Sequence, residues 1–491
     1  MNYYSRIAVP VLLISCLFTT QAYAPPPDIL WYEVYGGTEE DYGRAVCQAD
    51  GGYMVAAYGS SFGAGGDDVY VMKINEDGDT LWFKTYGGVA NERAFSIKPT
   101  SDNHYIISGF TSSQGSGGSD VWLLKVDENG DTAWTSYFGN LTWDAAYCAN
   151  ETSDNGFIVA GMSTIYGYGD QLFLVKTDAN GDSIWAKAYG GTDQDYGHWV
   201  KQTTDGGYIV VGRTYSYGPG LCNGWLLKTD ANGDTMWTRL YGGNGEDLLY
   251  TVLPLSDGSY ILVGGTDSWG AGLGDVYVVR AGADGDTLWM NWYGGANADQ
   301  GQHAIITHDG NIAIVGYTYS YAVGESDVYL LKIDLNGDTL WTTTVGGIYH
   351  DFGYYLDQTP DSGYIIAGRT RSWGAGQSDV YLIKTGTDLG AAENEGRDIS
   401  TNPTVFPNPF STSANISFGV DSRQYSVGSM RIYDVAGRCV KSFDPLPYAQ
   451  SPMQITWDGT DDVKNMLPNG VYLLRLTAGE HSETKKLLLI R

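Results

Sequence analysis

A tryptophan recurs along most of this sequence at a spacing of 51 or 52 residues. The residues around each one are similar too. The copy that starts at Trp185 reads WAKAYGGTDQDYGHWVKQTTDGGYIVVGRTYSYG and continues through GWLLKTDANGDT to the next tryptophan. A fixed period of this length indicates a repeated supersecondary unit that buries its apolar face against its neighbours. The seven recurrences are Trp31, Trp82, Trp134, Trp185, Trp237, Trp289 and Trp341.

Each copy contains four segments with the residue pattern of β-strands. In the copy at Trp185 these are WAKAYGG, YGHWVKQTT, GYIVVGRT and the segment equivalent to DVYLLK in other copies. Asp-Gly-Gly and Asn-Gly-Asp sequences between them are signals for tight hairpin turns. Four strands per repeat at this period are typical of one blade of a β-propeller. The sequence therefore predicts an all-β protein with a seven-bladed β-propeller over residues 28–386.

The two ends of the repeat array indicate how the ring closes. The first copy begins directly with its tryptophan strand, ILWYEVYGG. The last copy ends after DVYLIKT at Thr385, without the Gly-Asp-Thr-x-x-Trp that follows elsewhere. We therefore expect the N-terminal strand to supply the outer strand of the seventh blade, which leaves no open sheet edge.

Acidic residues dominate the repeat array. The chain has 28 Lys and Arg against 57 Asp and Glu, a formal net charge of −29. Residues 400–491 are close to neutral, so the negative charge belongs to the repeats. Such a surface lacks the cations that neutralise phosphates, and we expect neither nucleic acid nor an anionic membrane as a partner.

The first 24 residues have the pattern of an export signal. Arg6 precedes the apolar run 7–18, and Ala22-Tyr23-Ala24 forms a small-residue cleavage site before three prolines. We expect residues 1–24 to be a signal peptide and not a transmembrane segment, because the apolar run is too short. The lipobox-like sequence Leu13-Ile14-Ser15-Cys16 leaves open an alternative in which Cys16 becomes a lipidated N-terminus. The later cysteines have no metal-ligand spacing and no recognisable disulfide framework.

One acidic position, ten residues after each tryptophan, is the same in all seven copies. These acids open the strand expected nearest to the ring axis, where converging carboxylates could bind a cation. Calcium is the only cofactor that the sequence suggests. The alternative is structural: each carboxylate caps the preceding Gly-Gly turn or pairs with a neighbouring blade, and repetition favours that role. The seven residues are Asp41, Glu92, Asp144, Asp195, Asp247, Asp299 and Asp351.

Strand parity places the variable loops on one face of the ring and the uniform hairpins on the other. Variable loops on a rigid scaffold are where binding usually occurs. Six of the seven loops before the Asp-Val-Tyr segments carry an aromatic residue at one place, where it could stack on a sugar or anchor a protein partner. The alternative is that the rings wedge between blades. The six candidates are Phe62, Tyr166, Tyr217, Trp269, Tyr321 and Trp373, and Gln114 takes the seventh place.

No catalytic set of residues is recognisable in the sequence. The six histidines share neither a repeat position nor a ligand spacing, and no serine lies in a nucleophile elbow. Paired carboxylates are so common in this acidic array that they carry little information. We therefore expect a protein without enzymatic activity.

The sequence changes character after the repeats. Residues 387–404 are polar, Gly-containing and acidic, which is typical of a linker. Residues 405–491 then alternate strand-like segments with turn residues, and this pattern predicts a small Ig-like β-sandwich.

Both parts of the chain resemble known families. The repeats resemble the SBBP-type bacterial β-propeller repeat in their x-W-x-x-x-Y-G-G, Asp-Gly-Gly-Tyr-Ile-Val and Asp-Val-Tyr-Leu-Leu-Lys segments. The C-terminal part resembles the type A sorting domain of the type IX secretion system and the FlgD-like Ig domain. It does so through Phe406-Pro407-Asn408-Pro409, Trp457-Asp458-Gly459 and Asn469-Gly470-Val471-Tyr472. The sorting-domain resemblance implies a diderm bacterium, contact with its secretion machinery, and release at or anchoring to the cell surface.

Together these features favour a secreted or surface-displayed propeller that binds a glycan or a protein without catalysis. A structural component of a surface layer and a secreted glycan-active enzyme are the alternatives.

Overall fold

The computed structural model of the protein describes residues 25–388, 404–406, 410, 412–418, 427–434, 438–443, 453–478 and 481–489. The chain divides into two compact units, residues 1–391 and 392–491. The predicted signal peptide 1–24, with Cys16, and most of the predicted linker 387–404 lie outside the described residues. Within the described ranges, no helix is long and apolar enough to cross a membrane.

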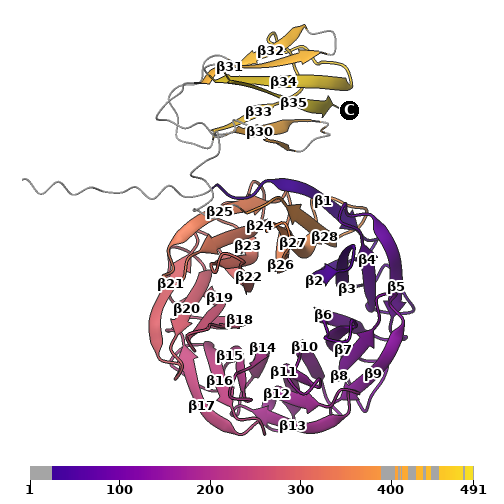
Figure 1. Ribbon diagram of the computed structural model, residues 1–491, viewed down its shortest axis with the longest axis vertical. Coiled ribbons are helices and arrows are strands. Elements are labelled where there is room, and N and C mark those ends of the chain that lie inside the picture. Colours follow the sequence, from indigo (N-terminus) through magenta and orange to yellow (C-terminus); the bar gives the residue numbers. More distant parts are fainter. Residues whose placement is uncertain are drawn as a thin grey trace, which may run out of the picture. The chain divides into compact units, whose positions relative to one another are not determined.

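Seven four-stranded antiparallel sheets form the first unit and surround one axis (Figure 1). Blades 1 to 4 contain β2 (Asp41–Ala49), β3 (Gly52–Gly59), β4 (Asp68–Ile74), β5 (Thr80–Tyr86); β6 (Glu92–Pro99), β7 (Tyr105–Thr111), β8 (Asp120–Val126), β9 (Thr132–Phe138); β10 (Asp144–Glu151), β11 (Phe157–Ile165), β12 (Gly169–Thr177), β13 (Ser183–Tyr189); and β14 (Asp195–Gln202), β15 (Tyr208–Thr214), β16 (Asn223–Thr229), β17 (Thr235–Tyr241). Blades 5 to 7 contain β18 (Asp247–Pro254), β19 (Tyr260–Thr266), β20 (Asp275–Ala281), β21 (Thr287–Tyr293); β22 (Asp299–Ile306), β23 (Ile312–Thr318), β24 (Asp327–Ile333), β25 (Thr339–Val345); and β26 (Asp351–Gln358), β27 (Tyr364–Thr370), β28 (Asp379–Thr385), β1 (Ile29–Tyr35). The predicted seven-bladed β-propeller is confirmed.

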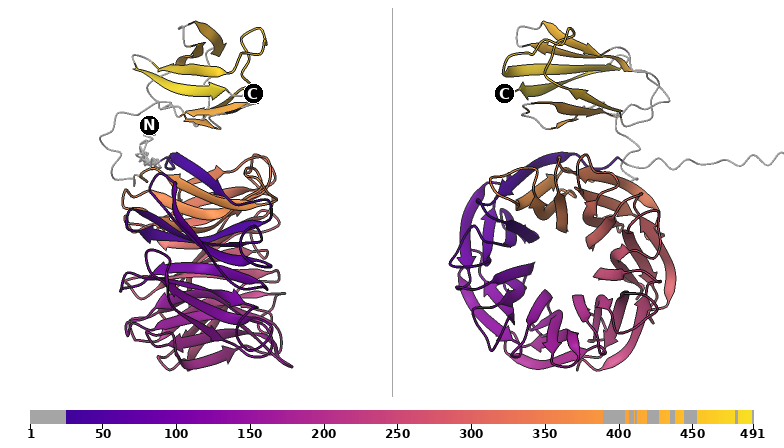
Figure 2. Two further views of the ribbon diagram at one scale, coloured as in Figure 1. Left: turned by 90° about the vertical axis from the view of Figure 1, so that its right-hand side faces the viewer. Right: turned by 180° about the vertical axis from the view of Figure 1, so that it is seen from behind.

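The first strand of each blade lies nearest to the axis, and the fourth forms the outer rim (Figure 1); Figure 2 shows the ring of blades from behind. Every residue of the two middle strands of blade 2, β7 and β8, is buried. Exposed residues alternate with half-buried ones along the outer strand β9. Middle strands have a neighbouring blade on both sides, whereas an outer strand turns one side to solvent, and this accounts for the two patterns.

The variable loops and the connections between blades share one end of the blades, as predicted. We call this end the loop face. In blade 1, for example, the backbone N–H of Glu39, in the connection before β2, donates to Ser61 Oγ in the loop after β3 at 3.1 Å. The first strand of every blade runs away from the loop face towards the hairpins.

Ring closure through the N-terminal strand is confirmed. β1 pairs antiparallel with β28, with Trp31 opposite Lys384 and Tyr35 opposite Val380. The backbone N–H of Gly386 also donates to the carbonyl of Asp28 at 2.7 Å. Each blade therefore has four strands, and the two ends of the array hold each other.

In most blades, the repeated Trp or Tyr of the outer strand donates a hydrogen bond to the blade that follows. Trp82 Nε1 donates to the Glu128 carbonyl at 3.1 Å, and the Tyr86 hydroxyl donates to the Gly130 carbonyl at 2.5 Å. Gly130 has a φ of 76° and faces the Trp82 ring so closely that a Cβ would lie 2.7 Å from it. The Asn-Gly turn is thus required both for its left-handed backbone and for its contact with the tryptophan.

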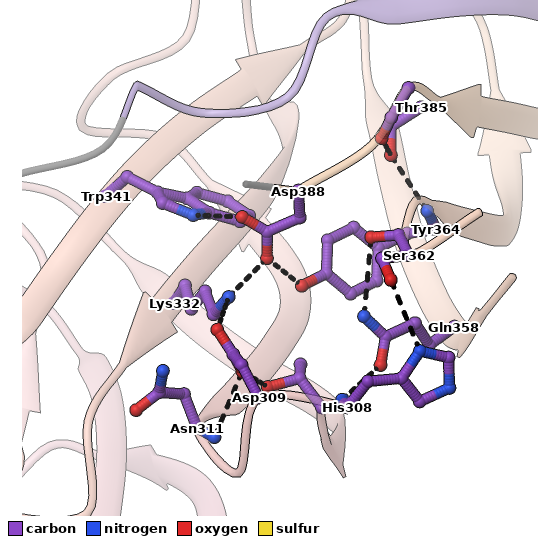
Figure 3. A network of polar contacts seen from close by, with 12 residues as sticks. His308, Asp309, Asn311, Lys332, Trp341, Gln358, Ser362, Tyr364, Thr385 and Asp388 are labelled. Atoms are coloured by element: carbon purple, nitrogen blue, oxygen red, sulfur yellow. Dashed lines mark hydrogen bonds and ion pairs between the residues drawn. The ribbon is translucent and has the colours of Figure 1, made fainter. Parts of the chain in front are cut away.

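Blade 7 lacks the hairpin that would accept this tryptophan bond, and Asp388 replaces it (Figure 3). Asp388 Oδ1 accepts from Trp341 Nε1 at 3.1 Å, and Oδ2 lies 2.5 Å from Lys332 Nζ and accepts from the Tyr364 hydroxyl. Lys332 also pairs with Asp309 at 2.7 Å. Asp388 belongs to the propeller core, two residues beyond the predicted boundary at 386.

The second unit has two antiparallel sheets, one with the strand order β29-β30-β33 and one with the order β32-β31-β34-β35. Buried side chains from both sheets form one core, centred on Trp457 of β33 and Tyr472 of β34. The predicted sandwich is thus a pair of packed sheets. Its strands are β29 (Thr404–Phe406), β30 (Ala414–Phe418), β31 (Val427–Asp434), β32 (Cys439–Phe443), β33 (Met453–Trp457), β34 (Gly470–Ala478) and β35 (His481–Leu489).

Candidate functional site

The seven repeated acids are buried at the loop face, at the start of each first strand. Each is at most 2% exposed. One carboxylate oxygen of each accepts a hydrogen bond from the backbone N–H four residues earlier at 2.6–2.9 Å, within the turn that precedes the first strand. This geometry is that of the capping alternative. Among the described residues no group of three or more His, Cys, Asp or Glu could hold a metal ion. Calcium binding at this ring stays the untested alternative, which a chelation experiment would test.

A second carboxylate lies beside most of these acids, across a glycine of the turn. At the junction of blades 2 and 3, a Cβ on Gly139 would lie 2.4 Å from Asp120 Oδ1 and 2.6 Å from Asp144 Oδ2. Only glycine fits between the two carboxylates, which explains why the turn requires it. Burial raises the pKa of Asp144, and the Asp120 carboxylate adds to that rise.

Five of the six candidate aromatic residues pack onto the third strand of their own blade. The ring centroids of Trp373 and Tyr381 are 5.4 Å apart, and those of Trp269 and Tyr277 are 5.6 Å apart. The Tyr217 hydroxyl also donates to the Gly190 carbonyl at the end of the preceding blade, at 2.7 Å. Phe62 and Tyr321 make equivalent ring contacts. These five rings match the wedging alternative while remaining half-buried or exposed.

Tyr166 differs from the other five because its loop in blade 3 is one residue shorter. There β11 and β12 extend into a tight hairpin, and Tyr166 is 96% exposed at its tip. Tyr168, Trp143 and Leu141 beside it are 56%, 53% and 81% exposed. The two segments are joined, since the Thr164 N–H donates to the Trp143 carbonyl at 2.8 Å. We call these four side chains the blade-3 patch.

A β-bulge in the first strand of every blade creates a second feature, for which the sequence carries no repeated residue. The register of each first strand shifts three residues after the repeated acid, so one residue per blade is left out of the ladder. A bulge re-aims the side chain it carries. These residues contact one another around the axis: Arg44 with Phe95 and Tyr354, Phe95 with Tyr147, Tyr147 with His198, and His198 with Tyr250. We call Arg44, Phe95, Tyr147, His198, Tyr250, Gln302 and Tyr354 the axial ring.

Two further arginines reach the axial ring from second strands. The Arg369 guanidinium lies 4.6 Å above the Phe352 ring and 4.8 Å above the Tyr42 ring. The Arg213 guanidinium lies 4.6 Å above the Tyr196 ring. Both arginines pair in register with the residue directly after a repeated acid, so they lie near the loop face.

The tyrosines of the axial ring connect these arginines electrostatically. Burial raises the pKa of Tyr147 to about 12, and Arg213 and Arg44 both oppose the rise. Burial also raises the pKa of Tyr354, opposed by Arg369 and Arg44. Burial, reinforced by Arg213, lowers the pKa of His198 to about 3, so His198 is neutral at physiological pH. The positive charge in this part of the ring therefore comes from arginine alone.

Closer to the hairpin ends of the first strands, packed side chains occupy the axis. The His303 and Tyr355 rings stack with centroids 3.8 Å apart, and Trp199 lies against both. Lys98 Nζ lies 4.7 Å from the Trp199 and Tyr355 ring centroids, and burial lowers its pKa to about 8. Because these residues come from blades 2, 4, 6 and 7, the axis is filled at this level.

The comparisons with known proteins identify the C-terminal unit. Residues 404–490 match the secretion system C-terminal sorting domain. No curated protein matches the chain.

Solved structures similar to this chain have little sequence in common with it. The extracellular domain of a putative hybrid two-component system from B. thetaiotaomicron is 10% identical with a TM-score of 0.42, over 94% of this chain and 58% of that one. Sqt1 from Chaetomium thermophilum is 11% identical with a TM-score of 0.42, over 95% of this chain and 99% of that one. Polysaccharide lyase Uly1 is 11% identical with a TM-score of 0.42, over 72% and 92%. The chain thus spans little more than half of the first of these structures.

The sheet topology and the C-terminal match together describe the protein. It is a β-propeller protein with a C-terminal type IX sorting domain, secreted or displayed at the outer surface of a diderm bacterium.

Proposed function

We propose that this protein is a non-catalytic binding or adhesion module, which its sorting domain delivers to the cell surface and which contacts its partner through the loop face. The propeller supplies a rigid frame because its blades are bonded to one another around a closed ring. The loops that project from this frame differ from blade to blade. Binding residues are commonly found on such loops.

The distribution of exposed apolar side chains supports the loop face as the binding surface. On the described part of the propeller, twelve large apolar residues on the loop face are exposed, whereas the hairpin ends of the strands carry six, namely Ile306 and one residue at the start of each of β1, β5, β13, β17 and β21. The others lie on the outer strands. Exposed apolar residues gathered on one face are typical of an interaction site. The twelve are Val89, Leu141, Trp143, Tyr166, Tyr168, Tyr217, Leu221, Leu273, Tyr321, Val323, Ile348 and Tyr349.

The tyrosines of the blade-3 patch contribute less to the fold than the other tyrosines of the loop face. Its tyrosines lie at a hairpin tip, whereas Tyr217 and Tyr321 hold the turns of preceding blades through their hydroxyl groups. Tyrosine and tryptophan are the side chains that most often anchor partners at interfaces. Substitution at Tyr166 and Tyr168 should therefore change binding and leave the fold unchanged.

The test measures binding of the purified chain to a glycan array and to immobilised cell-surface extracts. The Tyr166→Ala/Tyr168→Ala variant should lose most of the signal. The matched control is Leu81→Ala/Ile184→Ala, which removes two exposed apolar side chains from the outer rim and should bind like the wild type. Absence of wild-type binding to every glycan and extract would refute the proposal. Turnover of a polysaccharide would favour the enzyme alternative, and self-assembly into sheets without other partners would favour the surface-layer alternative.

A further inference from the structure

Within residues 25–388, the cations that lack a carboxylate partner are gathered at the propeller axis. Residues 25–388 contain seventeen Lys and Arg and 46 Asp and Glu. Twelve of the seventeen cations form an ion pair with Asp or Glu. The remaining five all lie on first or second strands of blades: Arg44, Lys98, Lys201, Arg213 and Arg369.

The three arginines near the loop face carry unused hydrogen-bond donors. Within the part of the chain that the structure describes, the Nε atoms of Arg44, Arg213 and Arg369 are buried without an acceptor. Aromatic rings hold the guanidiniums in place: Arg44 lies 4.3 Å from the Tyr354 centroid, and Arg369 and Arg213 lie over their own rings. Each side chain is half-buried, so part of it still faces solvent.

This arrangement is costly for a structural purpose. A buried cation without a carboxylate loses hydration that a cation–π contact replaces only in part. An acidic propeller has many carboxylates to offer, and Arg93 shows the paired solution at the same level: it stacks over Tyr58 and also bonds Asp67 at 2.7 Å. Unpaired guanidiniums in a ring are therefore better explained by an external anion.

The surroundings restrict the class of anion. The guanidinium fork fits the two oxygens of a carboxylate. Four tyrosines add flat apolar surfaces with a hydroxyl group at the edge. Such surfaces suit a sugar ring, which is partly apolar and partly hydroxylated. The four are Tyr42, Tyr147, Tyr196 and Tyr354. Acidic residues of the loop face repel a ligand with many negative charges. Glu40, for example, is half-buried beside Arg371 at the rim. A single carboxylate on a sugar fits both conditions.

We propose that the axial ring, with Arg44, Arg213 and Arg369, binds a uronic acid residue at the loop-face end of the axis. The carboxylate takes the guanidinium N–H donors, and the sugar ring lies against the tyrosines. This site rests on the proposed function, because it names one ligand class for the loop face, and it lies on the axis instead of at the blade-3 patch.

Isothermal titration calorimetry of the full chain with D-glucuronate, up to about 20 mM, tests the site. D-glucose is the neutral control, and acetate is the carboxylate without a ring. We expect glucuronate to bind, glucose not to bind, and acetate to bind at least about tenfold more weakly. Arg44→Gln and Arg369→Gln should each weaken glucuronate binding at least about tenfold. Arg371→Gln, at an exposed arginine paired with Glu40, should bind like the wild type.

Thermal melting separates loss of the site from loss of the fold. Glucuronate should raise the melting temperature of the wild type, because it binds only the folded state. Without ligand, Arg44→Gln should melt no lower than the wild type, since it removes an unpaired half-buried charge. No heat with glucuronate, equal binding of acetate, or equal binding by the Arg44 and Arg371 variants would overturn the site. Loss of array binding on changing Tyr166 and Tyr168 would still support the proposed function in that case.

Discussion

Asp388 should contribute far more to stability than its position at the end of the repeats suggests. Its carboxylate is fully buried and bonds Lys332, Trp341 and Tyr364. These partners belong to blades 6 and 7, so one side chain replaces the hairpin that every other blade has. The perturbation we choose is Asp388→Ala, with Asp388→Asn as the milder form.

The loss of unfolding free energy follows from the polar groups that would lose their buried partner in the alanine variant. The Trp341 N–H and the Tyr364 hydroxyl would each lose a buried acceptor, at about 1–3 kcal/mol per group. Lys332 would keep Asp309 at 2.7 Å, so the loss is smaller than for a fully isolated buried cation. We expect about 3–5 kcal/mol in total. For a domain of about 360 residues this corresponds to a fall in melting temperature of about 4–7 °C. Asparagine retains an acceptor for Trp341 and should cost less.

Differential scanning calorimetry measures the melting temperatures, and hydrogen exchange shows which strands lose amide protection. Amides of β1 and β28 should lose protection first, because ring closure depends on that pair. Asp131→Ala is the control: Asp131 pairs with Lys84 at 2.6 Å, but both side chains are largely exposed, at 76% and 36%, so the loss should stay below about 1 kcal/mol. Equal losses for the two alanine variants would refute the reasoning.

Three further predictions follow from the loop face. Burial raises the pKa of Asp327 to about 6, so the folded state binds the extra proton and stability falls as pH rises from about 4 to 6. Asp327→Asn should add about 1–2 kcal/mol to the unfolding free energy at pH 7.5 and nothing at pH 4, as urea titrations at both pH values would show; an equal effect at both would contradict this. In urea titrations, Trp373→Ala should lower the unfolding free energy by about 2–3 kcal/mol, because Trp373 packs on Tyr32 and Tyr381. Tyr166→Ala should lower it by less than about 0.5 kcal/mol, because Tyr166 is exposed. Similar losses for the two variants would contradict a packing role for Trp373. Finally, because backbone amides cap the repeated acids, EDTA should leave the melting temperature unchanged, and a marked fall would show a bound cation.

The repeat could be interpreted from the sequence because its signals are local. Trp82, Tyr86 and the Asn-Gly turn recur at fixed spacing, so each copy reports the same strands and hairpins. The missing hairpin after Thr385 was enough to predict closure through Trp31, since an open edge would be unfavourable. The aromatic positions were also recognisable, although their repetition could not separate the packed Trp373 from the exposed Tyr166.

The axial ring could not be found in this way. Its members occupy a repeat position that the copies do not share, with Arg44, Phe95 and His198 at equivalent places, so a search for shared residues passes over them. Variability alone does not single out this position either, because the residue after it differs even more between the copies. That Arg44 and Arg213 lack carboxylate partners is a further fact that no spacing reveals, because pairing depends on neighbours far apart in sequence.

The sequence alone determined the number of blades, the strand order, the closure of the ring and the sorting domain, because each depends on short segments repeated or matched in order. Only the tertiary structure decided which of those residues are available for function. The repeated acids accept hydrogen bonds from the turns beside them, most loop aromatics pack on strands, and the bulges direct one side chain per blade towards the axis. Burial and charge pairing are properties of the assembled ring, to which residues hundreds of positions apart contribute.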